Sequence, residues 1–215
     1  MLLELFTVSS LIFIIISSFA IYLKAKKIYS ISQHEPLKPF SISFLFFSLT
    51  GVLIILLESI IFFTYEIPLF IHLLFTFFFY FFSLTGILFL LLSFLWKEHT
   101  SENELYSIVR DKLKEKNSLL LILSFGIALF SLKELFLYYA ILLLTLFIGM
   151  ILSFDSTLKE KQSMNQLFFL IFLLGFLGNV SLFLGIFFET YLIYGLSILT
   201  LLFVILLRAV FTLLK

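Results

Sequence analysis

The sequence contains no cysteine and few charged residues. Without cysteine, the chain has no disulfide, no thiolate metal ligand and no cysteine nucleophile. Charged residues make up 13% of the 215 residues and hydrophobic residues 62%, and the mean hydropathy is +1.22. A water-soluble domain of this size could not bury that much apolar surface. The composition therefore indicates a membrane protein.

The motifs of common membrane enzymes and cofactor proteins are also missing. The chain has neither the HExxH motif of zinc proteases nor the GxSG motif of rhomboid-type proteases. A transmembrane haem takes paired histidines, but only His72 falls within an apolar run. A retinal Schiff base needs a lysine inside the last span, and Lys215 stands at its very end. We therefore expect no catalytic residue, no metal, no cofactor and no nucleic-acid partner, and enzyme is the weakest class.

Long apolar runs fill most of the chain, and a helical bilayer span needs about 20 predominantly apolar residues. The sequence predicts an all-α, single-domain integral membrane bundle over residues 1–215, with the lipid bilayer as its surroundings. The fourth span is short, and we expect Lys133 and helix before Asn117 to extend its ends. The seven predicted spans are Leu2–Leu23, Phe40–Thr64, Leu69–Trp96, Asn117–Leu132, Leu135–Phe154, Gln166–Phe188 and Thr190–Leu214.

The basic residues predict the orientation of these spans. With the N-terminus outside and the C-terminus inside, Lys133 alone of the 14 Lys and Arg residues lies on the outer side, as the positive-inside rule favours. Several acids fall on that outer side, where they either attract cations or are merely tolerated during insertion. These acids are Glu4, Glu58, Glu66, Glu134 and Glu189.

The stretch FFSLTG occurs twice, at Phe46–Gly51 and at Phe81–Gly86. Folding about the turn at Tyr65–Pro68 brings the two copies to the same depth in adjacent antiparallel spans. Small residues allow helix backbones to approach closely within a membrane, and hydroxyls bond locally or across the pair. We therefore expect the repeat to form a packing patch between spans two and three, made of Ser48, Thr50, Gly51, Ser83, Thr85 and Gly86.

Glycine and proline positions indicate how the other spans pack. Gly175, Gly178 and Gly185 follow helical spacing in the sixth span, which favours close packing against a neighbour over a ligand groove. All three prolines fall in predicted connections. The absence of proline within the spans favours straight helices and argues against the broken helices common in secondary transporters.

Three polar residues in apolar spans form a candidate ligand-binding site. Glu58 lies roughly 9 Å and Asn179 roughly 12 Å below the outer ends of their spans, at 1.5 Å per residue, and His72 begins span three. Ionisable residues at such depth are costly and indicate function. We expect the three to converge in the outer half of the bundle and to bind a cation or polar ligand. The alternative is a hydrated Glu58, a surface His72 and an Asn179 bonded to a neighbouring backbone carbonyl.

The inner connection after span three has the pattern of an amphipathic helix. Ser101 and Glu104 fit a capping box, and the apolar residues that follow share one helical face. Residues 101–116 either anchor span four at the membrane surface or dock a cytoplasmic or membrane protein partner.

Local features accompany the seven spans, the outside N-terminus and the short loops: Tyr22-x-Lys24 followed by Pro36–Pro39, Glu58 in span two, and Ile67-Pro68 leading to His72. In this pattern the chain resembles the membrane sensor modules of prokaryotic seven-helix receptors. The resemblance implies a non-enzymatic, receptor-like sensor or adaptor of the cytoplasmic membrane that signals or assembles through a separate partner. The alternative is a small-solute or cation transporter or channel subunit. A closed outer pocket over a packed inner half favours sensing, and a broken helix or continuous polar path favours transport.

Overall fold

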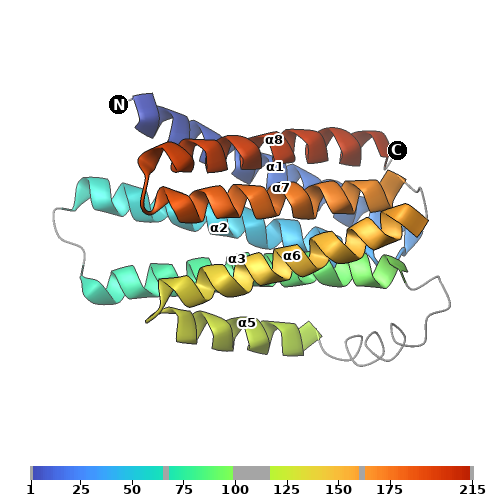
Figure 1. The fold of residues 1–215 in the computed structure, drawn as a ribbon, viewed down its shortest axis with the longest axis horizontal. Coiled ribbons are helices and arrows are strands. Elements are labelled where there is room, and N and C mark those ends of the chain that lie inside the picture. The colour runs from blue at the N-terminus through green and yellow to red at the C-terminus, as the bar shows by residue number, and fades with distance from the viewer. Residues whose placement is uncertain (1, 65–67, 99–116, 160–162, 214–215) are drawn as a thin grey trace.

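The computed structural model describes residues 2–64, 68–98, 117–159 and 163–213, and the regular structure within these ranges is entirely helical (Figure 1). The prediction of an all-α fold is confirmed. The seven described helices are α1 (Leu2–Ser32), α2 (Leu37–Phe63), α3 (Leu69–Glu98), α5 (Asn117–Ser131), α6 (Leu135–Lys159), α7 (Ser163–Gly185) and α8 (Glu189–Leu213).

Six of these helices are long and apolar enough to cross a membrane, namely all except α5. Large apolar side chains remain exposed on the outside of the bundle, as a lipid-facing surface requires; Ile122 and Phe130 are examples. The chain is therefore a multi-pass membrane protein. Helix α5, which corresponds to the fourth predicted span, has 15 residues and a length of roughly 22 Å, against a hydrocarbon thickness of about 30 Å.

Two helix boundaries near the first connection differ from the apolar limits. Helix α1 continues beyond Leu23 to Ser32, because the Lys-containing segment after Leu23 is a good helix former although it is not apolar. Gln33, the residue after the helix, has a left-handed φ of 51°, which is a common way for a helix to terminate. Helix α2 then begins at Leu37. Pro39 therefore lies in the first turn of α2, where its missing N–H costs nothing.

Six helices form a closed ring. Helix α1 packs on α2, α2 on α3, α3 on α6, α6 on α7 and α7 on α8, and α8 returns to α1. Helix α5 lies outside this ring, against α3 and α6 (Figure 1). The centre of the bundle is therefore bounded by six helices, and α5 takes no part in it.

The two ends of the bundle differ in charge among the described helices. We call the end where α1 begins the N-terminal end, and the end where α8 finishes the C-terminal end (Figure 1). The connections α5–α6 and α7–α8 lie at the N-terminal end, with Lys133 and Glu134 in the first of them and Glu58 near the end of α2. Lys24, Lys27 and Arg208 lie toward the C-terminal end.

The glycines of the FFSLTG repeat contact two different helices. A Cβ added at Gly86 would lie 2.7 Å from a ring atom of Phe47 and 3.2 Å from the Ser43 carbonyl oxygen, both on α2. A Cβ added at Gly51 would instead lie 2.5 Å from Ile15 Cγ1 on α1. The expectation that both glycines meet between α2 and α3 is therefore wrong for Gly51. Helix α2 is packed on both sides, by α1 and α3, and its single glycine, Gly51, faces α1.

The hydroxyls of the repeat are all buried, and those with described bonds bond mainly within their own helices. Thr50 Oγ1 donates to the Phe46 carbonyl at 2.9 Å, and Thr85 Oγ1 to the Phe81 carbonyl at 2.6 Å. Such local bonds satisfy the hydroxyl in an apolar interior without a partner helix. Ser48 and Ser83 are buried as well.

The glycines of α7 contact two neighbouring helices. A Cβ at Gly178 would lie 2.7 Å from Leu199 Cδ2 of α8, and one at Gly185 would lie 3.0 Å from the Leu192 backbone nitrogen. Gly175 faces Leu146 of α6 at 3.4 Å. The small face of α7 therefore serves close helix packing, mainly against α8.

Candidate functional site: a central cavity

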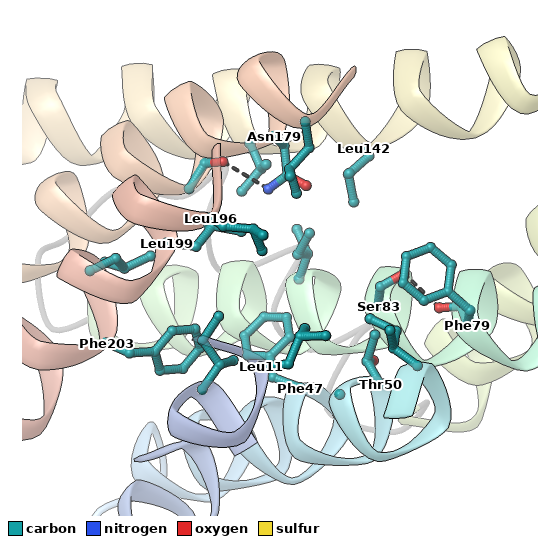
Figure 2. A pocket seen from close by; sticks show the side chains of 18 of the residues that line it. Leu11, Phe47, Thr50, Phe79, Ser83, Leu142, Asn179, Leu196, Leu199 and Phe203 are labelled. Atoms are coloured by element: carbon teal, nitrogen blue, oxygen red, sulfur yellow. Dashed lines mark hydrogen bonds between the residues drawn. The ribbon is translucent and has the colours of Figure 1, made fainter. Parts of the chain in front are cut away.

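A cavity of about 360 Å³ lies at the centre of the six-helix ring (Figure 2). Its lining includes residues of α1, α2, α3, α6, α7 and α8 and none of α5. On α2 it extends from Phe44 to Glu58, and on α8 from Leu192 to Leu206. Both stretches are about fourteen residues long, or roughly 21 Å. The cavity is therefore elongated along the helix axes, and its volume lies in the usual range for small-molecule pockets.

Most of the lining is aliphatic or aromatic, and the polar groups fall into two levels. Near the N-terminal end the polar lining residues are Thr7, Glu58 and Asn179. Glu58 both lines the cavity and is exposed. A side chain with both properties marks the mouth, so the cavity opens at Glu58.

The side chain of Asn179 is half-buried in the wall contributed by α7 (Figure 2). Its Nδ2 donates to the Gly175 carbonyl at 2.8 Å, one turn back on the same helix. This is the only hydrogen bond of that side chain among the described residues. One amide hydrogen and the Oδ1 acceptor of Asn179 therefore remain for a bound molecule.

Midway along the cavity, the polar groups already have partners. Ser83 Oγ donates to the Phe79 carbonyl at 2.8 Å and lies 2.7 Å from the Tyr138 hydroxyl, which joins α3 to α6. The Tyr138 ring stacks on that of Tyr80, with centroids 4.1 Å apart. These groups rigidify the wall and offer little free hydrogen-bonding capacity to a ligand.

Aromatic side chains close the cavity toward the C-terminal end. Phe40 and Phe168 contact across the ring from α2 to α7, with centroids 6.0 Å apart, and Phe94 of α3 lies 5.5 Å from Phe168. The rings of Phe44 and Phe203 also contact each other, with centroids 6.2 Å apart, and both line the cavity. We call these five residues the aromatic floor. All five side chains are buried, and three of them, Phe40, Phe94 and Phe168, lie beyond the lining toward the C-terminal end.

The structure brings together two of the three predicted site residues. Glu58 and Asn179 line the same cavity from α2 and α7. His72 is exposed near the start of α3 and is not among the residues lining the cavity. His72 is therefore a surface residue, as the alternative interpretation of the sequence expected. The Asn179 side chain donates to a backbone carbonyl, as the alternative interpretation expected, and it also lines the cavity.

Sequence reasoning missed the aromatic floor and the Ser83–Tyr138 pair. A tyrosine and a serine within apolar runs are a usable signal for the pair, since buried hydroxyls need partners. The floor has no such signal, because phenylalanine occurs 32 times in the chain. Residues 101–116, predicted to form an amphipathic helix, lie outside the described residues.

The described residues contain no group of three His, Asp or Glu side chains that could hold a metal ion. No protein-family model, curated protein or solved structure matches the chain. The chemistry of the cavity is therefore the guide to function.

Proposed function

We propose that the protein is a non-enzymatic, receptor-like sensor or adaptor of the cytoplasmic membrane. It binds a small molecule in the central cavity and signals or assembles through a separate partner. The observation that carries this proposal is the form of the cavity, which has a polar mouth at Glu58 and Asn179 and a closed aromatic floor. A pocket that ends inside the bundle can hold a ligand, whereas an open channel continues to the other side.

In this proposal the chain spans the membrane seven times, with the N-terminus outside and the C-terminus inside. The six long helices account for six spans, and α5, extended at its ends, supplies the seventh. Lys24, Lys27 and Arg208 at the C-terminal end support the orientation, because cytoplasmic segments carry an excess of Lys and Arg. The mouth at Glu58 then faces outward, where a receptor meets its ligand.

The alternative is a small-solute or cation transporter that uses Glu58. The exposed carboxylate at the mouth favours it. Against it stand the seven described helices, which are continuous, and the apolar lining between the mouth and the floor. A cation crossing this lining would lose its hydration without gaining ligands.

Reconstitution into liposomes separates the two functions. We expect no Na⁺, K⁺ or H⁺ flux above that of protein-free liposomes, measured with ion-sensitive dyes. Flux that Glu58→Gln abolishes and Glu134→Gln preserves would establish the transporter and refute the receptor. Glu134 is the matched control, because it is an exposed carboxylate at the same end of the bundle and does not line the cavity.

A further inference from the structure

The cavity identified above also constrains the class of its ligand. We propose that it binds an amphiphile with a protonated primary amine on a single hydrocarbon chain, the amine at Glu58 and Asn179 and the chain directed at the aromatic floor. This inference rests on the proposed ligand-binding function and specifies its substrate class.

The mouth offers hydrogen-bond acceptors and a negative charge. An ionised carboxylate only accepts hydrogen bonds, and the Glu58 side chain makes no hydrogen bond or ion pair within the described part of the chain. The Asn179 Oδ1 is a second free acceptor on the opposite side of the ring, with Nδ2 held by Gly175. A primary ammonium carries three N–H donors and a positive charge, and so complements both groups. An anionic head group would instead face the charge of Glu58.

The rest of the cavity selects a hydrocarbon chain. Below the mouth, its wall is formed mainly by Leu, Ile and Phe side chains, such as Leu142, Leu196 and Phe203 (Figure 2). The hydroxyls of Thr50 and Ser83 bond carbonyls of their own helices. A sugar or peptide would leave its polar groups unpaired here, at considerable cost. An alkyl chain fills a narrow cavity roughly 21 Å long without that cost.

Other occupants fit the lining less well. A bare metal ion needs several oxygen or nitrogen ligands, and the described residues contain no such group. A neutral alkane would gain nothing from Glu58. The two ends of the cavity therefore point to one molecule that is cationic at one end and apolar along the remainder.

The test uses the full chain in phosphatidylcholine nanodiscs and a dodecylamine that carries a diazirine near its terminal carbon. Irradiation should attach the probe to the aromatic floor, chiefly at Phe44 or Phe203, as mapped by peptide mass spectrometry. Unlabelled dodecylamine should displace the probe. Dodecyltrimethylammonium, which keeps the charge and lacks N–H donors, and dodecanoate should compete at least about tenfold less well.

Variants separate the head-group site from the chain site. Glu58→Gln should weaken probe binding about tenfold or more, since the amide oxygen of glutamine still accepts a hydrogen bond but carries no negative charge to pair with the ammonium, while Glu134→Gln should leave it unchanged. Competition by sphingosine, a membrane lipid with a primary amine on one long hydrocarbon chain, would identify a membrane lipid as the source of the amine, and competition by free alkylamine alone a soluble amphiphile. Both results support the amine class.

Two results would overturn the inference, and they have different meanings. If dodecanoate competes as well as dodecylamine, or Glu58→Gln has no effect, the ammonium class is wrong while the ligand-binding cavity stands. If adducts occur only on lipid-facing side chains such as Ile122 and Phe130, the cavity takes no chain. The liposome flux assay tests the receptor function independently of both results.

Discussion

A pair of glycine substitutions, Gly195→Ala and Gly126→Ala, should have opposite effects on stability. A Cβ at position 195 would lie 2.8 Å from Leu182 Cδ2 and 2.9 Å from the Leu182 backbone nitrogen. Because the backbone of α7 cannot yield as a side-chain tip can, α7 and α8 must separate. A Cβ at position 126 would meet nothing within 4 Å.

The magnitudes follow from these contacts. Overpacking costs about 1–3 kcal/mol, and replacing a helical glycine with alanine returns about 0.5–1 kcal/mol. Gly195→Ala should therefore lower the free energy of unfolding by up to about 2.5 kcal/mol. Gly126→Ala should raise it by up to about 1 kcal/mol.

Equilibrium unfolding in mixed detergent micelles, followed by circular dichroism, measures both variants under the same conditions. The two substitutions are chemically identical, so their difference isolates the packing of α7 on α8 from helix propensity. If Gly195→Ala is as stable as Gly126→Ala, the close approach of these two helices is refuted.

Two further predictions concern orientation and the cavity wall. In the cysteine-free chain, Lys133→Cys should react with a membrane-impermeant maleimide added outside the cell, and Lys27→Cys should react only from the inside. The reverse pattern would invert the proposed orientation. Tyr138→Phe should lower the free energy of unfolding by about 1 kcal/mol or less, because the 2.7 Å contact with Ser83 is lost. The control Tyr194→Phe, at an exposed position, should have no effect. If both variants lose the same stability in thermal unfolding, the contact between Tyr138 and Ser83 contributes nothing.

The positions of the helices could be predicted from the sequence because apolar runs and their polar or proline boundaries are one-dimensional signals. Helix α5 was predicted as Asn117–Leu132 and is observed as Asn117–Ser131. Depth along a span is equally readable, which is why Glu58 and Asn179 could be assigned to the same level.

Rotation about each helix axis could not be predicted in the same way. Helices that are apolar on all sides have no polar stripe to show which face points inward. His72 and Gly51 were therefore placed at suitable depths but on the wrong faces: His72 is exposed, and Gly51 contacts α1. The closed ring of helices could not be predicted either. It depends on the contact between α1 and α8, which are far apart in the sequence, and no local pattern signals such a contact.

The central claim is that the cavity opens at Glu58 and is closed at the opposite end. Two single-cysteine variants on α8 test it: Leu196→Cys in the cavity wall, and Val210→Cys, buried beyond the aromatic floor and not part of the lining. Each is exposed to a small, membrane-impermeant cationic thiol reagent, in sealed vesicles of either orientation. We expect Leu196→Cys to react only from the side of the N-terminal end, and Val210→Cys from neither side. Reaction of Leu196→Cys from the side of the C-terminal end would reveal an open path through the floor and contradict the account.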